Sequence, residues 1–467
     1  MHFEQYYLGC LAHASYLVGE GDECAIVDPR RDVDLYLEEA AARGLSIRYV
    51  LLTHLHADFV AGHCELARRA GAQICISEQA GAEFEHRAMR DGDRLSLGAL
   101  TLEFLATPGH TPEGMTILVH DPAVSSERPA KMLTGDTLFI GDVGRPDLVG
   151  SKGYSAEEMA GLMYDSLRTK ILPLDDAVEV YPAHGAGSAC GKNMSSERWS
   201  TLGKQRSENW ALQDMTREAF VHEAAGGLCA PPRYFAHDAA TNRRGAGGLD
   251  ELAPLPGLDA AAVEEALAAG ALALDVRPNT DYGAGHLPGS LNVGLSGQFA
   301  SWCGNLVEVE RGLVIVSADE EQAREARMRL ARVGIENVRG WLVGGAAAWE
   351  ESGRALQRTE QIDVDELKRR LDAQADLPLL DVRKPGEWEG GHAPGALTIT
   401  LDQLESRLDE LDRSKSWTLI CGSGYRSSAA AGILERAGFA GAVNVLGGTN
   451  AWVQAGHPLQ EFAASGS

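Results

Sequence analysis

The stretch Thr53-His54-Leu55-His56-Ala57-Asp58-Phe59 places two histidines and an aspartate on one short segment. It follows an apolar, β-branched run at residues 47–52, which predicts a buried strand. Residues 60–67, which come next, predict a helix. We therefore expect the histidines and the aspartate on a strand-to-helix loop at a sheet edge, where binding groups commonly lie. Imidazole and carboxylate groups this close together are typical of a divalent transition-metal site.

Three later segments carry further candidate ligands, and each lies where a predicted strand gives way to a loop. His110 follows the alternating run 100–105, and Asp136 follows a strand near residues 132–133. His184 follows a third apolar run. All the candidate ligands are therefore expected at strand ends, where one sheet edge could bring them together.

The order of these motifs, THxHxD, PGHT, GD and PAHG, resembles the metallo-β-lactamase fold, an αββα sandwich with its metal site along one edge of two sheets. The resemblance covers roughly residues 1–245. It is closest to the branch that contains persulfide dioxygenases and glyoxalase II. It implies that the PGHT histidine, His110, and the GD aspartate, Asp136, are metal ligands.

Phe59 separates the two activities of that branch. Glyoxalase II-like hydrolases have a histidine directly after the aspartate of THxHxD, and that histidine helps to hold a second metal. Phenylalanine offers no ligand and adds apolar bulk, so Asp58 and His184 alone make a poor second cage. A mononuclear site is therefore favoured.

Persulfide dioxygenases use one iron, and the resemblance implies that here His54, His110 and Asp136 hold it. Two histidines and a carboxylate leave other coordination positions open for substrate and O₂, which suits non-haem Fe(II). The remaining motif residues would orient these ligands or water from around the site; they are His56, Asp58 and His184. Direct ligation by His56 is the alternative.

Three residues beyond the motifs are candidate substrate contacts. Arg145, in a segment that resembles the GRxD sequence of the same branch, either binds an anionic substrate group or stiffens its loop by pairing with Asp142 or Asp147. Cys190, six residues past His184, either relays sulfur or is a small buried apolar residue. Lys192 is a candidate contact for the anionic part of the carrier thiol.

The second half of the chain repeats itself. Glycine and proline at residues 246–256 predict a linker. Beyond it the sequence LDVR at 274–277 returns at 380–383, and the motif GHxPG returns at the same offset of 106 residues. The closing motif GG..AW also occurs twice. These repeats predict two tandem α/β domains, at residues 257–356 and 357–467.

Both copies resemble rhodanese domains, and the second carries the functional signature. An apolar strand delivers Cys421 to a glycine-rich loop that leads into a helix at residues 428–436. The helix dipole, with Arg426, would stabilise the Cys421 thiolate and its persulfide. Cys421 and Arg426 enclose four residues, as in sulfurtransferases, whereas the similar loop of tyrosine phosphatases encloses five. The enclosed residues are candidate substrate contacts through their backbone N–H groups: Gly422, Ser423, Gly424 and Tyr425.

The first copy lacks this chemistry. Ser317 stands where the nucleophile belongs, and a serine hydroxyl cannot form a persulfide. Three acidic residues at positions 319–321 would repel anionic sulfur species. We expect this copy to be inactive and to act as a spacer or docking surface.

Composition narrows the partners. The formal charge of −25 argues against nucleic acid and anionic membranes, because phosphates would be repelled. The sequence holds no apolar run of the roughly 20 residues that span a bilayer. The first residues lack the basic and apolar regions of a secretory signal, and the eight cysteines are scattered. We expect a cytoplasmic protein. The sequence is compatible with both a monomer and a homo-oligomer.

Together these features predict a non-haem Fe(II) persulfide dioxygenase fused to a sulfurtransferase. The first activity would oxidise a low-molecular-weight persulfide (of glutathione, coenzyme A or cysteine) with O₂ to sulfite. The second, at Cys421, would combine sulfite with persulfide sulfur to give thiosulfate, in sulfide detoxification or sulfur oxidation. One alternative is a glyoxalase II-like thioester hydrolase with metal-activated water, fused to the sulfurtransferase. Another is a sulfur-carrier protein whose metal is structural.

Overall fold

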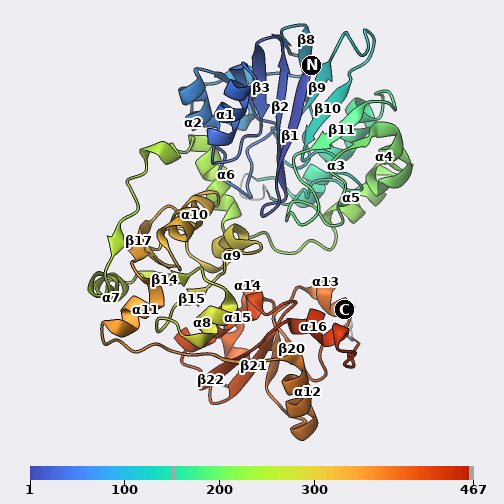
Figure 1. Ribbon diagram of the computed structural model, residues 1–467. Coiled ribbons are helices and arrows are strands. Elements are labelled where there is room, and N and C mark those ends of the chain that lie inside the picture. Colours follow the sequence, from blue (N-terminus) through green and yellow to red (C-terminus); the bar gives the residue numbers. More distant parts are fainter. Residues whose placement is uncertain (149–152, 462–467) are drawn as a thin grey trace. The chain divides into compact units, whose positions relative to one another are not determined.

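The computed structural model describes residues 1–148 and 153–461. Its internal contacts divide the chain into two compact units (Figure 1). The first comprises Met1–Leu252 with Ala331–Gly334, and the second comprises Ala253–Leu330 with the chain from Ile335 onward. Residues 462–467, which belong to the expected last domain, lie outside the described ranges. Among the described residues, no helix is both long and apolar enough to span a membrane.

The first unit contains two six-stranded sheets, each in an order that follows the chain. The first sheet consists of β1 (His2–Leu8), β2 (His13–Glu20), β3 (Glu23–Val27), β4 (Ser46–Leu51), β5 (Gln73–Ser77) and β6 (Arg87–Met89). The second consists of β7 (Arg94–Leu97), β8 (Leu100–Ala106), β9 (Met115–His120), β10 (Lys131–Gly135), β11 (Glu179–Pro182) and β12 (Ser200–Thr201).

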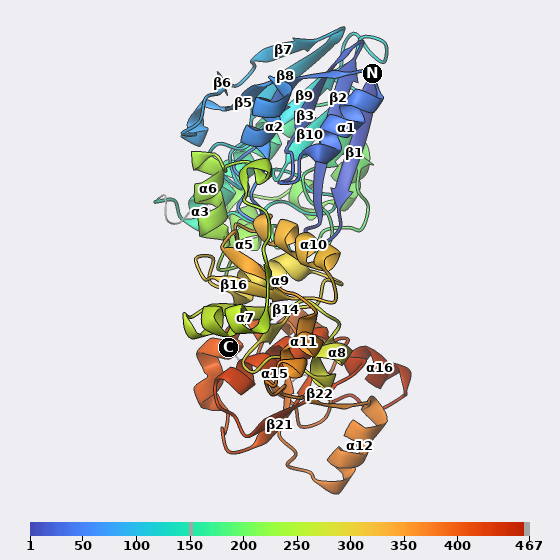
Figure 2. The ribbon, with the colours of Figure 1, turned by 60° about the vertical axis from the view of Figure 1, so that its left-hand side comes forward.

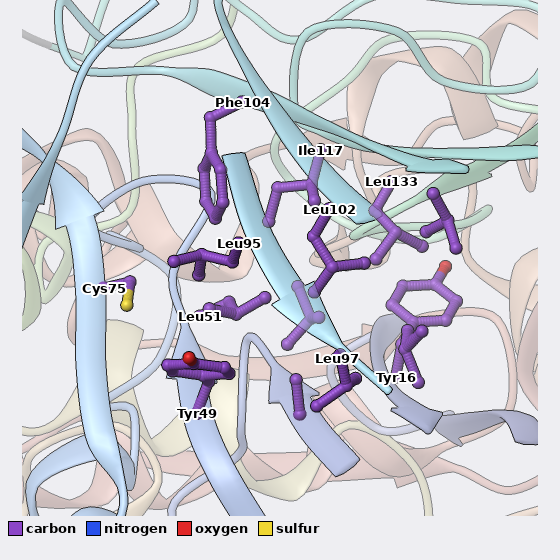
Figure 3. Close-up of a cluster of buried hydrophobic side chains, with 14 of the residues drawn as sticks. Tyr16, Tyr49, Leu51, Cys75, Leu95, Leu97, Leu102, Phe104, Ile117 and Leu133 are labelled. Carbon is purple, nitrogen blue, oxygen red and sulfur yellow. The ribbon is translucent and has the colours of Figure 1, made fainter. Parts of the chain in front are cut away.

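An apolar core joins the two sheets face to face (Figure 3). Leu51 comes from β4 of the first sheet, and Leu102 and Phe104 come from β8 of the second. Along β8, buried residues alternate with partly exposed ones, as the two-residue period of a strand requires. Burial of each such side chain is worth about 1.5–3 kcal/mol, so this layer is a main source of the unit's stability.

Helices cover the outer face of each sheet, which gives the four layers αββα. Helices α1 and α2 lie against the first sheet (Figure 2). Tyr36 of α1 and Leu66 of α2 share a core there with Ile26. On the second sheet, Met163 of α3 and Phe220 of α5 share another core with strands β9, β10 and β11. The helices are α1 (Asp34–Ala42), α2 (His63–Ala70), α3 (Ala156–Ser166), α4 (Leu202–Glu208), α5 (Arg217–Ala225) and α6 (Phe235–Arg244). Short 3₁₀ helices are η1 (Glu78–Ala80), η4 (Trp210–Leu212) and η5 (Leu249–Glu251), and η3 (Leu167–Ile171) is a π-helix. The predicted αββα sandwich is confirmed.

The second unit contains two five-stranded sheets whose strand pairs are all parallel. They have the same topology, because the orders β13-β17-β16-β14-β15 and β18-β22-β21-β19-β20 correspond strand by strand. The first has β13 (Gly257–Leu258), β14 (Leu272–Asp275), β15 (Leu291–Asn292), β16 (Leu313–Val316) and β17 (Val338–Leu342). The second has β18 (Glu360–Ile362), β19 (Leu379–Asp381), β20 (Leu397–Thr398), β21 (Ser416–Ile420) and β22 (Gly441–Val445).

Short helices connect these parallel strands. The first copy has α7 (Ala260–Ala268), α8 (Asn279–Ala284), α9 (Phe299–Leu306), α10 (Glu320–Ala331) and α11 (Gly345–Glu351). The second has α12 (Val364–Ala373), α13 (Pro385–Glu389), α14 (Leu401–Leu404), η6 (Glu405–Glu410), α15 (Tyr425–Arg436) and α16 (Gly448–Gln454). The internal repeat therefore corresponds to two α/β domains of one fold, and the predicted fold class is confirmed.

Two helix starts differ from the sequence-based expectation. The helix expected at 60–67 begins only at His63, because residues 60–62 are held against other loops; for example, the Gly62 N–H donates to the Pro29 carbonyl over 3.2 Å. The helix expected at 428–436 begins earlier, at Tyr425, directly after Gly424 in the left-handed region with φ 92°. The loop after Cys421 is therefore shorter than expected, and the helix begins closer to Cys421.

Candidate active sites

Three predicted ligands converge in the first unit from loops at one edge of the sheets. His54 follows β4, His110 lies between β8 and β9, and Asp136 follows β10. The Nε2 atoms of His110 and His54 lie 3.4 Å and 3.8 Å from Asp136 Oδ2. All three side chains are buried. Two imidazole nitrogens and one carboxylate that face one another are a donor set fit for a metal ion.

Hydrogen bonds fix which ring nitrogen each histidine presents. His110 Nδ1 lies 2.9 Å from the Arg145 carbonyl, so Nδ1 carries the proton and donates it. His54 Nδ1 lies 3.0 Å from Thr53 Oγ1, which itself donates to Asp28 Oδ2 over 2.8 Å. Both rings therefore leave the Nε2 lone pair free to bind a metal.

Asp28 is a site residue that the sequence analysis missed. Its buried carboxylate accepts from both the N–H and the hydroxyl of Thr53, and it lies 3.2 Å from His56 Nε2. Its backbone is in the left-handed region with φ 50°, which is strained for a residue other than glycine. The only signal in the sequence is an aspartate at the end of a predicted strand, which is common without any such role.

His56, Asp58 and His184 form a second group beside the first. His184 Nδ1 lies 2.8 Å from Asp136 Oδ1, and its Nε2 lies 2.9 Å from Asp58 Oδ2. Burial alone would lower the pKa of His184, but the two carboxylates raise that pKa well above its ordinary value. Burial opposes ionisation of Asp136, yet the surrounding histidines, His184 first, hold its pKa well below the usual range. His184 thus links Asp58 to the Asp136 carboxylate.

Phe59 packs in the middle of these histidines. Its ring centroid lies 4.5 Å from that of His56 and 4.1 Å from that of His13, and all three side chains are buried. His13, at the start of β2, belongs to no recognised motif, so no sequence signal pointed to it. An apolar ring therefore occupies the space beside His13 and His56.

The three candidate substrate contacts lie in different surroundings. The Arg145 guanidinium forms a two-pronged pair with Asp147, at 2.6 Å and 2.7 Å, and donates to the carbonyls of Ala189 and Cys229. Of its two expected roles, the structure shows the pairing, with Asp147. Lys192 Nζ donates to the Glu223 carbonyl over 2.6 Å and to that of Gly226, so it binds the carboxyl end of α5.

Cys190, by contrast, lies at the metal-ligand cluster. Its sulfur is within 4.8 Å of ligand atoms of Asp136 and His184, and the residue is buried. Burial, followed by the charges of Asp58 and Asp136, raises the pKa of this thiol well above its usual value. A thiol at this place is held protonated next to the candidate ligands.

The second unit holds the Cys421 loop between β21 and α15. The Cys421 sulfur accepts from the Gly424 N–H over 3.2 Å and from Ser427 Oγ over 3.4 Å. It lies at the amino end of a 12-residue helix, whose dipole stabilises a thiolate. Ser427, which the sequence analysis did not single out, is thus a direct partner of the sulfur. Arg426 pairs with Glu387. Among the described residues, the hydrogen bonds to the sulfur come from Gly424 and Ser427 and not from Arg426.

In the equivalent loop of the first copy, the Ser317 side chain forms its hydrogen bond within the loop. Ser317 Oγ donates to the Asp319 carbonyl over 2.7 Å, and Gln322 stands at the place of Arg426. This copy nevertheless contacts the active one within the unit. Ser428 Oγ of α15 donates to Asn292 Oδ1 over 2.7 Å, and the Tyr425 hydroxyl donates to the Gly294 carbonyl over 2.7 Å. The first copy therefore contacts the helix that begins at the Cys421 loop.

Comparison with known proteins agrees with this geometry. The model of the metallo-beta-lactamase superfamily matches residues 8–184, and that of the rhodanese-like domain matches residues 259–352 and 363–455. Human mitochondrial persulfide dioxygenase (Homo sapiens) is 33% identical over 192 residues, which span 39% of this chain and 68% of that protein. A hydroxyacylglutathione hydrolase from Anaeromyxobacter dehalogenans is 36% identical over 171 residues, spanning 36% of this chain and 60% of that protein.

A solved structure extends the similarity beyond the first unit. A crystal structure described as a metallo-beta-lactamase from Staphylococcus aureus has a TM-score of 0.65 and 29% identity, and the match covers 73% of this chain and 98% of that one. Fold and site define a protein of the metallo-β-lactamase superfamily with a buried group of histidine and aspartate side chains that could hold a metal ion. The chain belongs to the fusions of this superfamily with rhodanese domains, and its first domain is homologous to persulfide dioxygenases.

We predict that Asp28→Asn weakens metal binding about 10- to 100-fold, because the amide cannot accept from both Thr53 groups and the His54 ring loses its support. Competition with a chromogenic chelator measures the metal affinity. Asp22→Asn, which removes an exposed carboxylate from the turn before β3, is the matched control and should bind like the wild type. Equal affinity of all three proteins would contradict the role of Asp28.

We also predict that Asn292→Ala loosens α15, because Ser428 Oγ loses its buried acceptor. The free energy of local opening should fall by about 1–3 kcal/mol. Hydrogen–deuterium exchange of residues 425–436 in the full chain measures this. Asn305→Ala, whose amide donates only to the Ser301 carbonyl of its own helix, should leave that exchange unchanged. Unchanged exchange in Asn292→Ala would show that the contact does not support α15.

Proposed function

We propose that the protein is a persulfide dioxygenase with one Fe(II) site, joined to a sulfurtransferase that forms thiosulfate. The observation that carries the first half is Phe59, which is buried against His56. It stands directly after Asp58 in the sequence, where a glyoxalase II-like hydrolase has a further metal ligand. The homology to persulfide dioxygenases supports the same conclusion. The substrates would be O₂ and a small persulfide of glutathione, coenzyme A or cysteine.

His54, His110 and Asp136 would hold the iron, because the Nε2 atoms of both histidines face Asp136 Oδ2. Their Nδ1 atoms and Asp136 Oδ1 are engaged by other groups. Bound Fe(II) would supply the activation of O₂. Around it, His184 keeps the Asp136 carboxylate in place, while Asp58 and Asp28 hold His184 and the Thr53–His54 segment. In the balanced reaction, the persulfide, O₂ and water give the thiol, sulfite and two protons.

Cys190 would lie next to the outer sulfur of the bound persulfide, since its thiol is at the ligand cluster. Arg145 and Lys192 would act indirectly: Arg145 fixes the loop whose carbonyl orients His110, and Lys192 fixes the end of α5. Both side chains are therefore engaged by protein groups, and neither is placed to bind the anionic part of the carrier thiol.

At the second site, the Cys421 thiolate would attack the outer sulfur of a persulfide and release the carrier thiol. The N–H of Gly424 and the hydroxyl of Ser427 donate to the sulfur that carries the charge. Sulfite would then take the outer sulfur, and the electron pair of the broken S–S bond would return to Cys421. All eight cysteines are unpaired, which supports a reducing compartment such as the cytoplasm.

The second candidate, a thioester hydrolase fused to the sulfurtransferase, is favoured by the 36% identity to a hydroxyacylglutathione hydrolase. It requires metal-activated water and, in this branch, a second metal. His56, Asp58 and His184 offer ligand atoms for one, but Phe59 fills the adjoining space. This candidate predicts turnover without O₂ and about two metal ions per chain.

We predict that the iron-loaded protein consumes O₂ when it is given glutathione persulfide, and that the wild type accumulates thiosulfate. Cys421→Ser should consume O₂ at the same rate but accumulate sulfite, because the thiolate that transfers sulfur is gone. His110→Ala should lose at least about 100-fold in O₂ uptake, because a ligand is missing. An oxygen electrode and chromatography of sulfur oxyanions measure both activities.

Cys229→Ser, which removes an exposed thiol, is the control for loss of a cysteine and should behave like the wild type. An absence of O₂ uptake with the persulfides of glutathione, coenzyme A and cysteine, at full iron occupancy, would refute the dioxygenase. Thioester hydrolysis by that same preparation would then establish the hydrolase.

A further inference from the structure

The guanidinium of Arg426, the arginine of the sulfurtransferase loop, forms an ion pair with a carboxylate. Its Nη1 and Nη2 atoms donate to the two oxygens of Glu387, over 2.6 Å and 2.7 Å. Glu387 lies on α13, and one of its oxygens also accepts from the Lys384 N–H over 3.0 Å. This two-pronged geometry is the one in which a guanidinium binds an oxyanion ligand. Glu387 therefore takes the edge of Arg426 that such a ligand would use.

The pair lies directly over the catalytic loop. A methyl group placed on Gly422, the residue after Cys421, would lie 3.2 Å from Arg426 Nη2 and 3.8 Å from Glu387 Oε1. A cavity of about 500 Å³ opens at the same place. It is lined by both members of the pair and by residues of both rhodanese copies, among them Lys384, Ser423, Tyr425, Gln298 and Trp302. Both members of the pair are therefore accessible to a molecule in this cavity.

The pair is placed so that it can exchange partners. The Glu387 side chain is 38% exposed, whereas that of Arg426 is 15% exposed. A partly exposed ion pair of this kind is worth only about 1 kcal/mol, because water and salt screen it. A dianion offers more charge to the guanidinium than a carboxylate does, so it can compete for the same edge.

The inactive copy supports a link between this pair and the sulfur chemistry. By the 106-residue offset of the first motif, Asp281 stands at the place of Glu387. Gln322 stands at the place of Arg426, and Ser317 at that of Cys421. The copy without a nucleophilic sulfur therefore also lacks the arginine, although it keeps the same strand order.

We propose that Glu387 determines acceptor specificity in the sulfurtransferase. Its carboxylate holds the Arg426 edge in the resting site, and a small oxyanion acceptor such as sulfite must displace it. A thiol acceptor, which attacks as its thiolate and has no oxyanion group to bind that edge, need not. This rests on the proposed function of Cys421. The sulfite sulfur attacks the outer sulfur of the Cys421 persulfide, a new S–S bond forms, and the old one breaks with its electron pair left on Cys421. Arg426, once released from Glu387, binds an oxygen of the sulfite.

The test is the reaction of the full-length protein, with Cys421 first loaded as the persulfide, with increasing sulfite. Glu387→Gln should lower the half-saturating sulfite concentration about fivefold, the change expected when a partly exposed competitor is removed. The maximal rate should stay within about twofold. The rate with dithiothreitol, a thiol acceptor without an oxyanion group, should not change, and it also shows that the loop is intact.

Glu389→Gln is the matched control, because it removes the same charge two residues away from an exposed position. It should leave both acceptors unaffected, so an effect in Glu387→Gln cannot come from net charge alone. Raising the salt concentration should bring the half-saturating sulfite concentrations of wild type and Glu387→Gln closer together.

Three outcomes would overturn the inference. A higher half-saturating concentration or a lower maximal rate in Glu387→Gln would show that Glu387 holds Arg426 in its working position. An equal effect in Glu389→Gln would assign the change to general charge. If the sulfite kinetics of Glu387→Gln match the wild type, the carboxylate does not compete. Failure of the wild type to transfer sulfur to sulfite, with transfer to dithiothreitol intact, would instead refute the proposed acceptor itself.

Discussion

The charge on the buried Asp136 carboxylate is the constraint on which the first unit depends. A buried ion is strongly destabilising unless it is paired and hydrogen-bonded. Here three histidines from separate loops face it: His54, His110 and His184. Each of those loops follows or connects strands of the sandwich, so the packing of two sheets decides where the imidazoles lie. The positions of the site residues therefore depend directly on the packing of the two sheets.

A second ring of contacts fixes the first. Asp28 holds Thr53, Thr53 orients His54, and the Arg145 carbonyl orients His110. The Arg145 carbonyl is itself held by the pair that its side chain makes with Asp147. This explains why a buried arginine near a candidate anion site need not bind the anion. Its contribution is the position of a backbone oxygen.

Much of this arrangement could be predicted from the sequence, and the parts that could not share a reason. Motif order and strand ends predicted the layers, the convergence of His54, His110 and Asp136, and the two rhodanese copies. The sequence analysis missed Asp28 and His13, because neither belongs to a recognised motif and only the tertiary structure brings them to the site. The partners of Arg145 and Lys192 depend on which carbonyls and carboxylates lie within reach, and the sequence leaves several. The start of α15 moved because Gly424 adopts a left-handed conformation that ends the loop early.

The contact between Ser428 and Asn292 has a consequence for how the tandem domain can change during evolution. The copy with Ser317 has neither the cysteine nor the arginine that its neighbour carries at Cys421 and Arg426. It does supply two acceptors, at Asn292 and Gly294, to side chains of α15 in that neighbour. A substitution of Ser317 touches neither contact directly, whereas one of Asn292 removes the first. The sequence of this copy is in this way constrained by the helix of its neighbour.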